Sequence, residues 1–210
     1  EASLAAGHVK AQTVPVQSPP PQVIVSQVPA ILVPIDGAPV WRPVPDDSRF
    51  RRVINTSALL LQGGVGSRLY LHVFDGWMTA ESIDGPWTQA SFTPLGIDEV
   101  AGNLAAKDHV DLLDGGPQTK PRPSLANGAP AIYVTTQPAE LLVFRGPPNF
   151  VPVAGTQLLW ASNTHADVFV ETTNNRYYAL FAGRWFSAPA LTGPWTFVAN
   201  DALPADFARI

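Results

Sequence analysis

The chain has no cysteine, one methionine and few charged residues, since Asp, Glu, Lys and Arg make up only 14% of its 210 residues. Without cysteine, disulfide scaffolds, thiol catalysis and thiolate metal sites are excluded. The net charge of −4 offers no basic surface to neutralise phosphates, which argues against a nucleic-acid partner. No run approaches the roughly 18 apolar residues of a membrane-spanning helix, so we expect no membrane span.

An internal repeat is the strongest feature that the sequence does contain. Residues 21–39 recur as residues 130–148 with seven of 19 positions identical, and residues 68–90 recur as residues 176–198 with eight of 23 identical. The offset falls from 109 to 108 between the two blocks, so the second copy lacks one residue. Units of this length exceed the short periods of solenoids, and each is interpreted as a small domain or half of a pseudo-symmetric one.

Short extended segments separated by turns dominate each unit. In the second copy we expect strands at 131–134, 141–144, 150–153, 157–161, 168–171, 177–182, 185–188 and 195–198. Between the copies, one apolar stripe with helical spacing predicts a helix: Ile97, Val100, Ala101, Leu104 and Ala105. The sequence therefore predicts a mainly β fold of two tandem pseudo-repeats, each an antiparallel meander sheet, with one connecting helix.

These signals divide the chain into four segments. Residues 1–20 are interpreted as the end of a preceding helix and a Pro-rich linker, and residues 21–113 as the first β-repeat with its helix. Residues 114–129 form a second linker, and residues 130–210 form the second β-repeat.

Both ends of the chain resemble the region of the connecting helix. Leu4-Ala5-Ala6 and His8-Val9 are similar to Leu104-Ala105-Ala106 and His109-Val110. The segment from Leu203 to Phe207 corresponds to the entry of that helix near Pro94 to Asp98. We therefore expect the chain to be an excerpt or a processed piece of a longer protein, with further segments of that protein or another copy of the chain as partners.

Two resemblances to known proteins add to this interpretation. The turn Ser82-Ile83-Asp84-Gly85-Pro86-Trp87-Thr88 resembles hairpins of β-propeller blades, which implies a meander. Most of the chain from about residue 21 to 210 resembles large bacterial exported repeat proteins loosely labelled carbohydrate-binding family V/XII. The residues that carry this resemblance are Pro138–Leu141, Gly155-Thr156, Asn163-Thr164, Gly183–Phe186, Gly193–Trp195 and Leu203–Ala208. It implies export to the periplasm, cell surface or extracellular space, and it brings no catalytic set.

Tryptophans are the first candidates for a binding site, because an exposed indole offers a flat apolar face to a sugar ring. The pairs Trp77/Trp185 and Trp87/Trp195 recur in both copies, where we expect them to anchor the core. Trp41 and Trp160 have Phe150 and Arg51 as counterparts, so these two tryptophans are the candidate carbohydrate-binding residues.

Polar groups give weaker candidates. One hairpin contains the acids and the histidine that an enzyme or a metal site would need: His72, Asp75, Glu81 and Asp84. None of these four residues recurs in the second copy. We therefore prefer to interpret them as a solvated turn. The pairs Asn55-Thr56 and Asn163-Thr164 recur ahead of strands, where short polar side chains commonly bond local backbone. We expect their role to be structural.

The two copies share turn glycines, prolines and aromatics, whereas acids and histidines differ between them. The sequence therefore predicts a non-catalytic structural or interaction module of a larger bacterial envelope or exported protein, with no cofactor and no metal. A carbohydrate-binding module, with a polysaccharide as partner, is the alternative, and a glycosidase-like enzyme is third.

Overall fold

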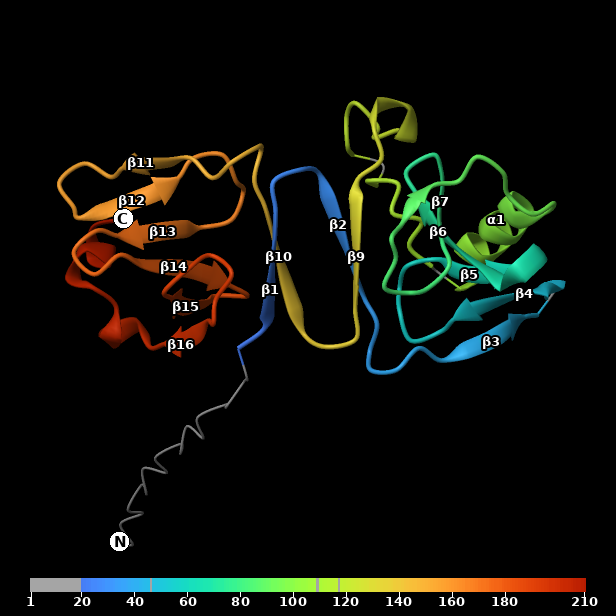
Figure 1. The fold of residues 1–210 in the computed structure, drawn as a ribbon, viewed down its shortest axis with the longest axis horizontal. Helices are drawn as coiled ribbons and strands as arrows, with labels where there is room; N and C mark the ends of the chain where they lie inside the picture. The colour runs from blue at the N-terminus through green and yellow to red at the C-terminus, as the bar shows by residue number, and fades with distance from the viewer. Residues whose placement is uncertain (1–19, 46, 109, 117) are drawn as a thin grey trace, which may run out of the picture.

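A computed structural model describes residues 20–45, 47–108, 110–116 and 118–210. Within them the chain forms sixteen strands, one α-helix and four short 3-10 helices. Two six-stranded sheets stand at opposite ends of the molecule, with two pairs of strands between them (Figure 1). Nearly all of the expected terminal helix and Pro-rich linker, residues 1–19, lies outside the described residues.

The first unit contains eight strands, and the last six form an antiparallel meander in sequence order. The strands are β1 (Gln22–Ser26), β2 (Ala30–Pro34), β3 (Trp41–Val44), β4 (Asp47–Val53), β5 (Leu60–Gly63), β6 (Arg68–Val73), β7 (Gly76–Ala80) and β8 (Thr88–Gln89). A 3-10 turn, η1 (Val65–Ser67), joins β5 to β6, and helix α1 (Ile97–Asp108) follows β8. No helix in the described part of the chain is long and apolar enough to cross a membrane.

The second unit repeats this order after a linker that contains η2 (Leu125–Asn127). Its strands are β9 (Ala131–Thr135), β10 (Ala139–Val143), β11 (Phe150–Pro152), β12 (Leu158–Ala161), β13 (Val168–Glu171), β14 (Arg176–Phe181), β15 (Arg184–Ala188) and β16 (Thr196–Val198). Two 3-10 turns, η3 (Asn200–Ala202) and η4 (Ala205–Arg209), follow β16.

The two six-stranded sheets have the same strand order and the same register. The pair Leu60 and Leu71 of β5 and β6 becomes the pair Val168 and Ala179 of β13 and β14, which preserves the offset of 108. The extra residue of the first unit falls in the β3–β4 hairpin, where the register shifts after Pro43. The predicted mainly β fold, with two pseudo-repeats of antiparallel meanders and one helix, is confirmed.

The first two strands of each unit pair across the units. β1 runs parallel to β10, and β2 runs parallel to β9. The hydrogen bonds that flank these pairs also correspond: the Ile35 amide donates to the Thr135 carbonyl at 2.8 Å, and the Phe144 amide donates to the Ser26 carbonyl at 2.8 Å. The two units are therefore related by a pseudo-two-fold exchange.

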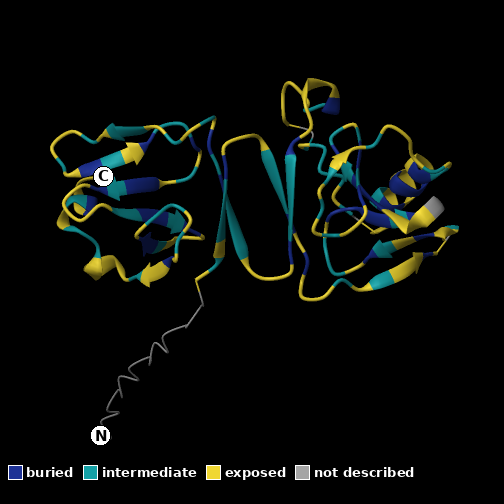
Figure 2. Ribbon diagram, in the orientation of Figure 1, coloured by how far each residue is buried: buried dark blue, intermediate teal, exposed yellow. Residues whose placement is uncertain are grey.

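The exchange decides which strand covers which sheet. Val23 and Val25 of β1 pack against the inner face of the second sheet, although β1 precedes the first sheet in sequence. Ile132 and Val134 of β9 pack against the inner face of the first sheet. Each sequence repeat thus gives its first strand to the core of the other, and buried residues line both inner faces (Figure 2).

The outer faces of the two sheets are covered differently. On the first sheet, α1 packs its buried residues Ile97, Val100 and Leu104 against β5 to β7. On the second sheet, Phe207 of η4 lies against Phe169, Tyr178 and other residues of that face. The layers from one end to the other are α1, the first sheet, β2 with β9, β10 with β1, the second sheet and η4 (Figure 1).

Separating the two units tests the exchange. We expect residues 1–115 and residues 116–210, expressed apart, not to fold as monomers, because each inner face then lacks a strand from the other half. Co-expression is expected to give a folded 1:1 complex, measured by size-exclusion chromatography and circular dichroism. A half that folds stably as a monomer contradicts the exchanged packing.

Candidate functional site

The tryptophans that occur in both units are core residues, as predicted. Trp77 and Trp195 are only 5% and 4% exposed. Trp87 and Trp185 are half-buried, each packed against a core cluster of its own unit. In both Trp87 and Trp195 the indole nitrogen donates to the carbonyl four residues earlier, at 3.2 and 3.1 Å. These two indoles therefore hold the Gly-Pro-Trp turns.

Trp41 and Trp160, the two predicted carbohydrate-binding residues, lie in different units and are not brought together. Trp41 begins β3 and is half-buried against the inner core of the first sheet. Its counterpart Phe150 is packed in the same way in the second unit, with its ring 5.9 Å from that of Tyr177. Trp41 therefore serves the core.

Trp160 is the most exposed tryptophan among those described, at 38%. Its position in β12 is opposite Phe169 of β13, which places it on the outer face of the second sheet. The strand register also changes the counterpart of Trp160 in the first unit. Trp160 pairs with Phe169, and Leu61, the equivalent of Phe169, pairs with Arg52. The counterpart of Trp160 is therefore Arg52 and not Arg51. The expected counterpart was displaced by one residue because the extra residue lies before this position.

Polar groups on the outer face of the second sheet are already bonded within the protein. The Glu171 carboxylate accepts hydrogen bonds from the amide and the hydroxyl of Thr173. The Ser187 hydroxyl accepts a hydrogen bond from Arg176 at 3.0 Å. A sugar ring stacked on Trp160 would need polar partners beside it, and these groups would first have to give up internal bonds.

The His72 hairpin does not assemble an acid–base site. His72 Nδ1 donates to the Leu112 carbonyl at 2.8 Å, and its ring lies edge-on to Trp77 at 4.9 Å. Glu81 is 3.5 Å from Arg68, and Asp84 is exposed in its turn. The described part of the chain contains no group of three His, Asp or Glu side chains that could hold a metal ion.

Asp75 instead holds the linker between the units. Its carboxylate accepts hydrogen bonds from the Ser124 hydroxyl at 2.6 Å and from the Leu125 amide at 2.9 Å. The Ser124 hydroxyl, and next the Leu125 amide, lower the pKa of Asp75 below its ordinary value, against the opposing effect of burial. Asp75 therefore stabilises the start of η2 in its ionised form.

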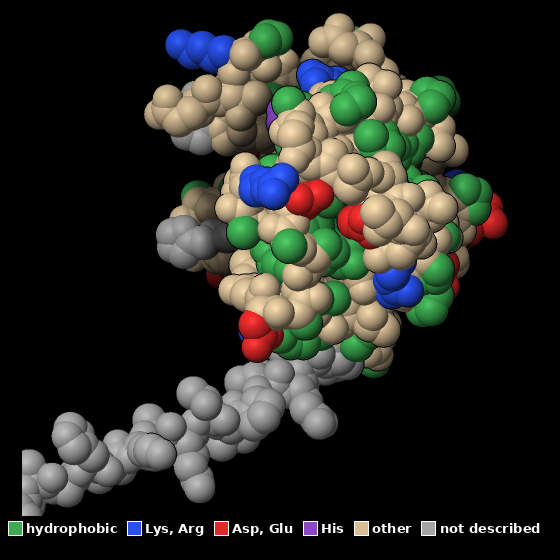
Figure 3. All heavy atoms as spheres, turned by 90° about the vertical axis from the view of Figure 1, so that its left-hand side faces the viewer, with side chains coloured by type: hydrophobic (Ala, Val, Ile, Leu, Met, Phe, Trp, Pro, Cys, Tyr) green, Lys and Arg blue, Asp and Glu red, His purple; other side chains and the backbone are tan. Residues whose placement is uncertain are grey.

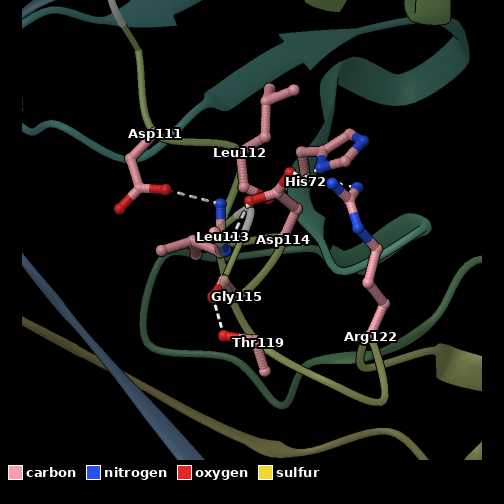
Figure 4. Close-up of polar contacts among 9 residues, drawn as sticks. His72, Asp111, Leu112, Leu113, Asp114, Gly115, Thr119 and Arg122 are labelled. Carbon is pink, nitrogen blue, oxygen red and sulfur yellow. Dashed lines mark hydrogen bonds and ion pairs between the residues drawn. The ribbon is translucent and has the colours of Figure 1, made fainter.

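The chain after α1 is fastened to the same end of the first sheet. Figure 4 shows Asp111 accepting a hydrogen bond from the Leu113 amide (2.8 Å) and His72 reaching the Leu112 carbonyl. Further along, the Thr119 hydroxyl donates to the Gly115 carbonyl. His72 and Asp75 thus organise the linker, whereas the sequence predicted only a solvated turn.

Asn55 makes a network that the sequence only partly revealed. Its side-chain amide donates to the carbonyls of Asp36 (2.7 Å) and Ala38 (2.9 Å), and its carbonyl accepts from the Val40 amide (2.8 Å). The predicted structural role is confirmed. The backbone that Asn55 bonds is 15 to 19 residues away and not local as expected, whereas the Thr56 hydroxyl accepts locally from the Ala58 amide at 3.4 Å. Asn55 therefore fixes the loop that carries the chain from β2 to β3.

Asn163 makes the same three bonds in the second unit. Its side-chain amide donates to the carbonyls of Arg145 (3.0 Å) and Pro147 (2.8 Å), and its carbonyl accepts from the Asn149 amide (2.9 Å). The recurrence of Asn-Thr at an offset of 108 was the sequence signal for both networks. Each network fixes the loop that connects a central strand to the first strand of a six-stranded sheet.

A cavity of about 360 Å³ lies between α1 and the β3–β4 hairpin. Two of its acids are paired with arginine: Asp47 with Arg49 at 2.5 Å, and Asp108 with Arg52 at 2.9 Å. The hydrogen bond from the Arg49 side chain lowers the pKa of Asp47. The Asp47 carboxylate therefore favours its ionised form, which does not suit a general acid, and both ion pairs hold structure.

Comparison with known proteins finds no family model, no curated protein and no solved structure that matches the chain. The geometry of the described residues therefore carries the argument about function.

Removing the Asn55 network should destabilise the protein. We expect Asn55→Ala and Asn163→Ala each to lower the free energy of unfolding by about 1–2 kcal/mol, because three backbone groups lose their partner. Asn55→Asp should cost at least as much, because a carboxylate then faces two carbonyl oxygens. Urea denaturation measures the change. Asn103→Ala on the exposed side of α1 is the control, with an expected effect within about 0.5 kcal/mol, and an equal effect there would refute the assigned role.

The Asp75 contact should weaken in acid. Because the pKa of Asp75 is lowered in the folded state, its stabilisation is present above the unfolded pKa and is lost as pH falls through the lower folded value. We expect the protection of the Leu125 amide, which is its exchange rate relative to the intrinsic rate at the same pH, to fall only below about pH 4. Asp75→Asn should remove this pH dependence, while Asp84→Asn should leave it. A protection of the Leu125 amide that stays constant as the pH falls would exclude the contact.

Proposed function

We propose that the chain is a non-catalytic structural or interaction module of a larger bacterial envelope or exported protein. Its role is to present a rigid two-sheet body to further segments of that protein or to another copy. Export rests on the resemblance of residues 21–210 to exported repeat proteins. The module needs no cofactor for this role.

One observation carries the proposal: the two units repeat hydrogen-bond networks and turns of their scaffold, whereas the acids and the histidine of the His72 hairpin are not repeated. The Asn55 and Asn163 networks and the Gly-Pro-Trp turns are the same in both. The hairpin of His72 and Asp75 has Leu180 and Gly183 in its place in the second unit. A duplicated enzyme would be expected to keep reactive side chains in at least one assembled cleft.

Carbohydrate binding is the second candidate because Trp160 is 38% exposed beside Phe169 and Val151 on a sheet face. A flat array of this kind is suited to stacking on sugar rings. Glu171 and Ser187 on the same face already make hydrogen bonds within the protein, which disfavours their use as partners for a sugar.

Cell fractionation tests the first candidate. In the organism that encodes the chain, antibodies against it should detect a product larger than 22.5 kDa in the periplasmic, surface or secreted fraction. A free 22.5 kDa product in the cytoplasm would exclude a module of a larger exported protein.

A polysaccharide pull-down with the purified chain separates the two candidates. We expect no retention on insoluble glycans and no release of reducing sugar. Retention that is lost in Trp160→Ala but kept in Trp41→Phe, with both variants folded by circular dichroism, would favour carbohydrate binding over the structural role.

A further inference from the structure

The hydrophobic core divides the chain at different places from the sequence repeat. Two of the four core clusters contain only residues between 30 and 135, and the other two contain only residues of 22–26 and 139–210. These sets form a first lobe (residues 30–135) and a second lobe (residues 22–26 with 139–210). Figure 1 shows the division, with β2 and β9 beside the first sheet and β1 and β10 beside the second.

The first lobe is one continuous stretch of chain. The two strands that cover the inner face of its sheet, β2 and β9, lie at the two ends of that stretch. The linker that leads into β9 is held by Asp75, which belongs to the same lobe. The core of the first lobe therefore contains no side chain of β1.

The second lobe is made from two separate pieces of chain. Residues 139–210 supply β10 and the second sheet, whereas the strand beside β10 is β1, which precedes the whole first lobe in sequence. Val23 and Val25 of β1 pack against the core of this lobe. Within the described residues β1 pairs with β10 alone. The second lobe is thus incomplete until β1 binds at its position beside β10, which is called the β1 site below.

Very little chain joins β1 to the first lobe. The Gln27 carbonyl accepts a hydrogen bond from an amide of the second lobe at 3.1 Å, and the Pro29 carbonyl accepts one from an amide of the first lobe at 2.9 Å. Val28 lies between them and is 55% exposed. Residues 136–137 make the equivalent crossing between β9 and β10, and both are exposed. The described lobes are therefore joined covalently by two short, exposed arches.

This connection allows β1 and the lobe that it completes to belong to different molecules. When either arch opens, β1 can bind the β1 site of another chain with the same contacts that it makes here. We propose that the β1 site is a docking site for β1 of a second copy of this chain, so that two copies associate by exchanging this strand. The proposal rests on the proposed function and deepens it, because it names the partner and the part that binds.

The β1 site recognises its strand by backbone and side chains together. The Gln22 amide donates to the Pro138 carbonyl at 3.0 Å, and the Phe144 amide donates to the Ser26 carbonyl at 2.8 Å, so the parallel strand is bonded at both ends. Two valines of β1 enter the apolar inner face. β9, the repeat of β1, has apolar side chains at the same positions, but they are packed in the first lobe. The matching strand in a second copy is therefore its β1.

The charge of the chain does not oppose an approach of two copies. Seen from the side of the second unit, charged side chains of both signs are scattered among uncharged ones (Figure 3). The net charge is only −4 over 210 residues. Repulsion between copies is therefore weak at physiological ionic strength.

Engineered cysteines test the exchange in the full chain, which has no cysteine of its own. Ile24 of β1 and Leu141 of β10 are partners in register. Chains with Ile24→Cys and chains with Leu141→Cys are co-expressed, purified together and oxidised. We expect a disulfide-linked product of twice 22.5 kDa. Its yield should exceed that of the control below about tenfold, because thiols on paired strands meet at a high effective concentration.

The matched control uses the equivalent pair of the first lobe. Leu32 of β2 and Tyr133 of β9 are partners in register, and they are the repeat counterparts of Leu141 and Ile24 at an offset of 109. Co-expressed Leu32→Cys and Tyr133→Cys chains should give only the linked product of random collisions, because both strands belong to one continuous lobe. A single chain with both Ile24→Cys and Leu141→Cys shows whether this pair forms the disulfide.

Each other outcome overturns the proposal. Linkage only within the doubly substituted chain means that β1 stays with its own copy. Equal yields from the two mixtures mean that the linkage is not specific to β1. No linkage in the doubly substituted chain refutes the pairing of β1 with β10. A chain that exchanges no strand can still be a module of an exported protein, which cell fractionation tests separately.

Discussion

The reciprocal pairing of β1 with β10 and of β2 with β9 is the interaction on which the rest of the structure depends. Parallel strands cannot be joined by a tight turn and need a long connection. Here the connection between β1 and β10 includes the whole first sheet and its helix. Each six-stranded sheet buries its inner face on strands from both repeats, so neither repeat has a complete core by itself.

Sequence periodicity predicted the strands and the helix but not the pairing of β1 with β10 and of β2 with β9. Strand 168–171 was predicted with its observed bounds, and the helix from Ile97 followed from its apolar stripe. β1 and β9 have similar apolar patterns because they are repeats of one another. A pattern of this kind says that a strand is buried, but it cannot say which of two equivalent sheets buries it. The exchange is a choice between two arrangements with nearly the same local contacts.

The candidate site was predictable to a similar extent. The shared tryptophans could be assigned to the core because a duplicated indole beside a turn serves packing in each copy. The exposure of Trp160 could not be derived, since exposure depends on what lies over a face, and the covering elements differ between the two sheets. The partners of Asn55 were also hidden, because a side chain that bonds backbone 19 residues away leaves no local pattern.

Two aspartates attach the covering helical segments to the outer faces of the sheets. Asp98 accepts a hydrogen bond from the Trp77 indole and so ties α1 to the first sheet at 2.7 Å. Asp206 accepts one from the Gln157 amide, also at 2.7 Å, and ties η4 to the second. In both cases a charged side chain makes a tertiary contact between a helical segment and a sheet.

The exchange also bears on how the chain acquires its structure during synthesis. β1 emerges from the ribosome about 117 residues before its partner β10. The first sheet can form its meander early from local hairpins, but its inner face waits for β9. Contacts so distant in sequence form late and slow the search for the native state. Until then part of the apolar inner surface of the first sheet is open to solvent, so the nascent chain passes through a stage in which protection by a chaperone would favour correct assembly over aggregation.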